Sequence, residues 1–248
     1  MKATKSIYLL SFVAIFICSG CYYSGNLNLG GIEPSSNYIT REFNTPTFNA
    51  ISTSIVGDIY YEQSTDGTTA LSVYGPDNIV ELVTVSVKNG ELKVEMKEKI
   101  KIRNVKNFKI TISSPEIDNI TFKGVGDFIT KNGITANKLS IYSSGVGDIN
   151  IRGIVCNKLT AHLEGVGNIN LKGEVAEAIL SSKGVGNIKA SDLISKSTNA
   201  TVKGVGDISC FASEKIKASA LGVGGIRYKG NPKEKELKKK GVGSIKGE

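Results

Sequence analysis

The amino-acid sequence predicts an all-β protein, a parallel β-helix (a solenoid) with coils of about 20 residues. Three observations predict it. A five-residue word, Gly-Val-Gly-Asp/Asn-Ile, recurs in seven complete or weakened copies between Gly124 and Ile245, at intervals of 18 to 21 residues. Apolar residues follow a period of two on both sides of each word, which is typical of β-strands. Glycine supplies 28 of the 248 residues and tryptophan is absent, a composition typical of a chain that turns often.

The first segment, residues 1–20, has the pattern of a bacterial lipoprotein signal. Two lysines in the first five residues are followed by an apolar run from Ile7 to Ile17. This run is shorter than the roughly 20 residues that span a bilayer, so it indicates a secretory signal. The small residues Ser19-Gly20 then precede Cys21. We therefore expect Cys21 to be acylated and to hold the chain on a membrane. The alternative is an ordinary cleaved signal with an incidental cysteine.

The remaining chain divides into a tether and one long domain. Residues 21–38 are polar and rich in Gly, Ser and Asn, which predicts a flexible tether. Residues 39–248 are expected to form the β-helix, with irregular N-terminal coils over 39–120 and regular repeats over 121–248. Within the irregular part, Lys88-Asn89-Gly90 indicates a tight turn between two strands. The strand-like runs there are residues 70–74, 79–87, 91–96 and 108–113, and residues 55–59 form an eroded eighth copy of the word.

The positions of a repeat are counted here from the first glycine of its word, which is position 0. Position 4 is Ile or Phe in every complete copy, and positions −4 and 6 are mostly apolar. One coil cannot bury these residues alone, but stacked coils form a continuous core. Equivalent residues then form ladders of valine, isoleucine and Asp/Asn, and we expect the valines to be turned away from bulk solvent. A leucine-rich repeat is disfavoured because its leucine pattern and any helical segment are missing.

These words and their flanking segments resemble the head GIN domain family of auto-transporter adhesins. The resemblance includes the segment 54–63, the stretches 71–78 and 110–117, and Arg41-Glu42-Phe43, and it covers residues 39–248. It implies a right-handed parallel β-helix and a secreted or outer-membrane lipoprotein of Gram-negative bacteria, often of the Bacteroidetes type. Because Tyr22-Tyr23-Ser24-Gly25 follows the cysteine in place of acidic residues, a surface-exposed and a periplasm-facing orientation are both open.

The Asp/Asn row at position 3 is the sharpest candidate for chemistry. Its carboxylates at Asp127 and Asp148 come from neighbouring coils and could share a cation, because hard cations take oxygen ligands. The favoured alternative is a corner ladder in which these side chains accept hydrogen bonds from backbone N–H groups. His162 is expected to point into solvent. Cys210 is expected to be a small core residue, without a disulfide to Cys156. No catalytic residue and no cofactor is predicted.

The charge distribution and the outward positions limit the function. Of the net charge of +8, most lies in residues 227–248, which hold eight basic residues and three glutamates. No basic face runs through the body, so a nucleic-acid partner is not expected. We expect a non-enzymatic envelope protein, an adhesin-like or structural scaffold, whose partners are the membrane through its lipid and a glycan, extracellular-matrix or cell-surface ligand. A polysaccharide-acting enzyme and an envelope-stress or signalling accessory are the alternatives. Such an enzyme needs paired acids on an outward face. In this chain Ser, Thr, Lys and Asn predominate at the outward positions, which disfavours the enzyme.

Overall fold

The computed structural model describes residues 31–97 and 101–248. The predicted signal segment, the acylation candidate Cys21 and the first part of the predicted tether lie outside these described residues. Residues 31–248 form a single unit. No helix in the described ranges is long and apolar enough to cross a membrane.

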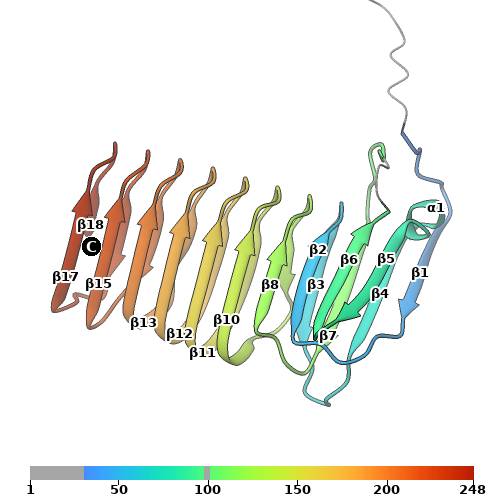
Figure 1. Cartoon of the computed structure of the whole chain (residues 1–248), viewed down its shortest axis with the longest axis horizontal. Helices are drawn as coiled ribbons and strands as arrows, with labels where there is room; N and C mark the ends of the chain where they lie inside the picture. The colour runs from blue at the N-terminus through green and yellow to red at the C-terminus, as the bar shows by residue number, and fades with distance from the viewer. Residues whose placement is uncertain (1–30, 98–100) are drawn as a thin grey trace, which may run out of the picture. The chain divides into compact units, whose positions relative to one another are not determined.

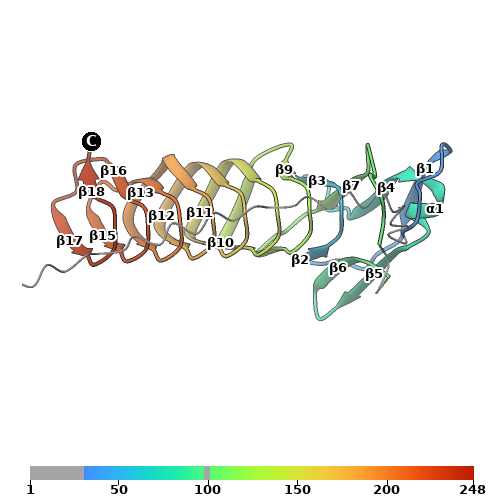
Figure 2. The same ribbon diagram turned by 90° about the horizontal axis from the view of Figure 1, so that it is seen from above.

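The repeats form a parallel β-solenoid of about 6 turns, as the sequence predicts. Strands of successive coils lie side by side in Figure 1, and Figure 2 shows the coils as consecutive loops. Every pairing between neighbouring coils in this part is parallel. The strands are β8 (Asn119–Phe122), β9 (Phe128–Thr130), β10 (Ile134–Ser143), β11 (Ile149–Leu163), β12 (Ile169–Ser182), β13 (Ile188–Val202), β14 (Ile208–Phe211), β15 (Lys215–Ala220), β16 (Ile226–Lys229), β17 (Glu234–Lys239) and β18 (Ile245–Gly247).

Equivalent positions stack over one another to form the core. Ile141, Ala161 and Leu180 are paired in consecutive strands, and all three occupy position −4. The residues at position 4 are completely buried from Phe128 to Ile226. Burying one such side chain contributes about 1.5–3 kcal/mol, so the stack rather than any single coil stabilises the fold. Differences in coil length are absorbed by register shifts, such as the one between Ile151 and Ile154.

The valines of the words face solvent, so the expectation that they are turned away from it is wrong. About half of each side chain is exposed in the copies from Val125 to Val223. The reason is the period of two. Positions −4 and −2 point inward and the glycine at position 0 continues that series, so position 1 points outward. Gly145 at position 0 lies so close to the previous coil that a Cβ would overlap the carbonyl oxygen of Gly124. The prediction of a solenoid is nevertheless correct, because the isoleucine ladder at position 4 is buried and forms the core.

The N-terminal part is less regular, as expected, but it is not built only of coils. Strands β2 (Ala50–Ser54) and β3 (Asp58–Gln63) form a coil that pairs in parallel with β8 and β9, and Val56 bridges Val125. On its other side lie β6 (Glu91–Met96) and β7 (Lys109–Ser114), also parallel. The remaining pairings between strands are antiparallel and involve β1 (Tyr38–Phe43), β4 (Ala70–Pro76) and β5 (Val83–Lys88). A short helix, α1 (Asp77–Val80), follows β4.

The C-terminal coil has a polar wall strand, β17. Every residue of β17 is exposed. Lys235, Leu237 and Lys239 are paired with the buried residues Ile216, Ala218 and Ala220 of the preceding coil, so these three occupy inward positions at the open end of the core. Charged residues at such an edge discourage pairing with another strand.

Candidate functional site

The Asp/Asn row forms a hydrogen-bonded ladder along one corner of the solenoid. The Oδ1 atom of Asp148 accepts a bond from the backbone N–H of Asn168 at 2.8 Å, and Asn168 accepts one from Asn187 at 3.2 Å. The same bond joins Asp127 to Asp148 at 2.8 Å. Side-chain amides add bonds in the same direction, such as Asn187 Nδ2 to Asn168 Oδ1 at 3.1 Å. The ladder therefore satisfies backbone donors at the corners, which confirms the hydrogen-bonding alternative for this row.

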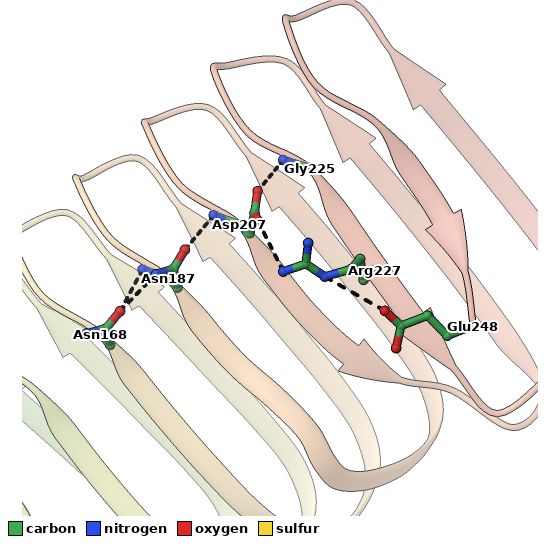
Figure 3. Close-up of polar contacts among 6 residues, drawn as sticks. All are labelled: Asn168, Asn187, Asp207, Gly225, Arg227 and Glu248. Atoms are coloured by element: carbon green, nitrogen blue, oxygen red, sulfur yellow. Dashed lines mark hydrogen bonds and ion pairs between the residues drawn. The ribbon is translucent and has the colours of Figure 1, made fainter.

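The ladder ends in an ion pair at the C-terminal coils (Figure 3). Asp207 accepts a bond from the N–H of Gly225 at 2.7 Å. The row ends there because glycine replaces the Asp/Asn residue in that coil and has no side chain to accept the next bond. The second carboxylate oxygen of Asp207 lies 3.2 Å from the Arg227 guanidinium, which also lies 3.8 Å from the Glu248 carboxylate. These pairs are largely exposed, so each contributes at most about 1 kcal/mol.

The cation site at Asp127 and Asp148 stays a prediction. Each carboxylate uses its Oδ1 atom as an acceptor within the ladder, and Asp148 also receives the amide of Asn168 at 3.0 Å. In the described ranges, no group of three or more His, Cys, Asp or Glu residues is placed to hold a metal ion. The arrangement brings the two acids into neighbouring coils, as the sequence predicts.

The outward valines form a second row beside the Asp/Asn ladder, and we call it the valine ridge. Each valine bridges the next in parallel, so neighbours lie about 4.8 Å apart. On its other side lies the row at position −1, which includes Lys123, Lys183 and Lys203. The ridge is thus an apolar strip between two polar rows. The backbone turns that carry it follow the arrowheads of the strands in Figure 1. Its members are Val56, Val125, Val146, Val166, Val185, Val205, Val223 and Val242.

A small polar cluster crosses three coils next to the ridge. The Tyr142 hydroxyl donates to the Glu164 carboxylate, and Lys183 Nζ lies 2.8 Å from the same carboxylate. The lysine, followed by the tyrosine hydroxyl, lowers the pKa of Glu164, and the carboxylate raises the pKa of Tyr142. His162, paired with Tyr142, is at an outward position and is partly exposed. The cluster is exposed and links neighbouring coils through their side chains.

The two cysteines of the described chain are core residues. Cys156 and Cys210 are both buried and both are free thiols, and the burial of Cys210 was expected. Burial raises the pKa of Cys210 to about 12 and that of Cys156 to about 11. Both thiols are therefore protonated at neutral pH and poorly nucleophilic, because the thiolate is the reactive form.

The valine ridge is the feature that the sequence interpretation missed. A signal was present: the period of two, carried through the glycine at position 0, places valine on the outward face. The prediction was wrong because an apolar residue repeated in every coil is typical of a buried ladder.

Comparison with known proteins agrees with this architecture. A family model described as "Putative auto-transporter adhesin, head GIN domain" matches residues 47–232. The chain belongs to this family. The resemblance of its repeated words to the head GIN domain is thus confirmed. No curated protein matches the chain.

Solved structures share the fold of this head GIN domain. A putative adhesin from Bacteroides fragilis is 50% identical, covers 88% of this chain and 100% of its own, and superposes with a TM-score of 0.87. A putative adhesin from Parabacteroides merdae is 23% identical, covers 87% of this chain and 99% of its own, with a TM-score of 0.63. A structure described as a putative lipid binding protein, from Parabacteroides distasonis, is 24% identical, covers 88% and 100%, and has a TM-score of 0.66. The latter two show the fold alone.

Proposed function

We propose that this head GIN domain is a non-enzymatic, adhesin-like binding scaffold of the bacterial cell envelope. Acylated Cys21 anchors it in the outer membrane, and the valine ridge contacts a glycan, an extracellular-matrix chain or another cell-surface ligand. The family description and the 50% identical putative adhesin support a role in adhesion. The exposure of the valine ridge is the observation that carries the proposal.

The physical argument starts from the cost of exposing apolar groups. Contiguous exposed apolar surface is uncommon on soluble proteins and marks interaction sites. Here the half-exposed valines are held in register by the backbone, so the ridge is pre-organised and little conformational entropy is lost on binding. Each square ångström of ridge covered by a ligand contributes about 25 cal/mol. An extended ligand that follows the solenoid meets the same contact once per coil.

The proposal also requires the domain to face outward from the cell. An outer-membrane lipid anchor supplies durable attachment, because each buried acyl CH₂ contributes about 0.8 kcal/mol. We expect an antibody against the solenoid to label intact cells, and substitution of Cys21 by alanine to release the protein from the membrane fraction. Labelling only after the outer membrane is opened would contradict the adhesin function.

The ridge is tested by replacing valines with threonine, which preserves the β-branched shape but adds a hydroxyl. We expect the triple variant Val166→Thr/Val185→Thr/Val205→Thr to weaken binding on glycan and matrix arrays by about tenfold or more, because each apolar contact becomes a desolvated hydroxyl. The matched control is Val155→Thr, since Val155 is equally exposed but lies outside the ridge.

The outcomes of this experiment separate the alternatives. Retained binding in the triple variant, or an equal loss in the Val155 control, would remove the ridge as the contact surface. Cleavage of an array glycan would contradict the non-enzymatic function. Circular dichroism of each variant confirms that the solenoid is intact.

A further inference from the structure

A hollow lies on the wall of the solenoid that follows the Asp/Asn ladder. It occupies about 680 Å³ between the turn that joins β9 to β10 and the continuous strand β11, and Lys131, Asn150 and Arg152 are among the residues that line it. A second hollow of about 300 Å³ shares Asn150 and Arg152 and continues to Asn170 and Lys172 on β12. The two hollows therefore follow one another along the direction in which the coils stack.

The hollow arises from a difference in coil length. Ile129 is paired with Asn150, and Ile134 is paired with Ile154. The segment from Ile129 to Ile134 is therefore one residue longer than the equivalent segment of the next coil. Residues 130–133 are not paired with β11, although Gly133 approaches the next coil so closely that a Cβ would lie 2.6 Å from the Gly153 carbonyl oxygen. Residues 131–133 form a bend outside the pairing of β9 and β10 with β11, and the hollow lies next to this bend.

The side chains around the hollow form two columns with different chemistry. Lys131, Arg152 and Lys172 occupy position 7 of three successive coils and line the two hollows, and we call these three residues the basic column. Asn150 and Asn170 occupy position 5, and the amide of Asn170 donates to Asn150 Oδ1 at 2.8 Å. That bond uses the oxygen of Asn150 and leaves its own amide hydrogens for a ligand.

The positive charge of the basic column is only partly neutralised. Lys172 lies 2.6 Å from the Asp192 carboxylate, and Lys131 lies 4.0 Å from that of Glu62. Within the part of the chain that the structure describes, Arg152 forms no ion pair, and its exposed guanidinium lines both hollows. Asp148, two residues before Asn150, uses its Oδ1 atom within the Asp/Asn ladder.

We propose that these hollows bind adjacent units of an acidic polysaccharide, with a sugar carboxylate or sulfate held by Arg152. The planar guanidinium can bond two oxygens of such a group at once, and charge-assisted hydrogen bonds are about twice as strong as neutral ones. Lys131 adds a second charge, the Asn150 amide donates to a ring hydroxyl, and Ile129 at position 5 offers an apolar surface to the ring. This inference rests on the proposed binding function, adds a second contact surface to the valine ridge, and names the ligand class that this second surface takes.

The test measures binding of the full-length protein to defined oligosaccharides by calorimetry. A galacturonate oligomer supplies carboxylates, a heparin oligomer supplies sulfates, and a dextran oligomer of equal length is the neutral probe. We expect binding to at least one acidic oligomer and none to dextran. Arg152→Gln should raise the Kd for that oligomer by about tenfold or more, because a hydrogen bond to a charged group is lost.

The matched control is Lys196→Gln, which removes the same charge from an exposed position on β13 that lines neither hollow and lies outside the valine ridge. We expect it to change the Kd less than twofold. An unchanged Kd in Arg152→Gln, an equal loss in the Lys196 variant, or equal binding of dextran would overturn the inference. If none of the oligomers binds while array binding still depends on the valine ridge, the acidic-sugar site is wrong and the proposed function survives.

Discussion

At the residue scale, glycine in the repeated word decides whether neighbouring coils can approach. Gly147 has a φ of +136°, and a Cβ there would overlap the carbonyl oxygen of Gly126. We expect Gly147→Ala to lower the free energy of unfolding by about 3 kcal/mol or more, because it combines backbone strain with a clash that only a backbone shift relieves. Urea denaturation measures the effect.

A control separates the two causes. Gly67 also has a positive φ, of +78°, but a Cβ there would meet nothing within 4 Å. Gly67→Ala should therefore cost only the strain of the left-handed conformation, about 1–2 kcal/mol. Equal losses in the two variants would show that the close approach of the coils contributes nothing.

The direction of individual side chains was predictable where the period of two was followed consistently. It placed the isoleucine ladder and Cys210 in the core and His162 on the outer face, as observed. The prediction for the valines was wrong because it followed their apolar character, whereas the period of two places position 1 on the outer face. The Asp/Asn ladder followed from the tendency of these side chains to bond backbone N–H groups at turns. The hollow at Arg152 could not be predicted, since it depends on where in a coil the extra residue is accommodated.

At the element scale, β17 is an edge strand, and its lysines discourage pairing with another chain. In β17, Lys235 and Lys239 occupy positions that are apolar in the preceding coil, and Leu237 between them is half-exposed. We expect Lys235→Val/Lys239→Val to cause end-to-end association, because an apolar edge strand with free backbone groups pairs with another chain. Size-exclusion chromatography with light scattering measures the change from the wild-type mass.

The matched control moves the same substitution to the outer face. Lys238 lies between the inward positions and points away from the core. Lys238→Val should therefore leave the oligomeric state unchanged. Association in this control, or none in the double variant, would show that the inward lysines do not protect the edge.

The N-terminal elements show which pairings a sequence reveals. The hairpin of β5 and β6 was predictable, because Asn89 and Gly90 adopt the positive φ values, 53° and 75°, that such turns require. The placement of β6 and β7 on the far side of the β2–β3 coil was not. That coil is contiguous in sequence with neither neighbour, so no local period indicates which strands it pairs with.

At the scale of the whole molecule, the solenoid is a one-dimensional stack whose stability is the sum of contacts between neighbouring coils. The coils of β11, β12 and β13 are paired on both sides through long strands, whereas β17 and β18 are paired on one side only. The buried ladder also weakens toward that end, since Ile226 is fully buried and Ile245 is partly exposed. Local opening should therefore begin at the C-terminal coil.

Hydrogen exchange measures this gradient directly. We expect amides of β12 to exchange slowest, with a rate set by opening of several coils, and those of β18 to exchange fastest. Protection should fall progressively from β13 through β15 to β17, because each coil closer to the end opens by breaking fewer contacts. A fully cooperative domain would instead protect β17 and β12 equally. That result would mean that coils are coupled beyond their nearest neighbours, and the additive description of the stack would be wrong.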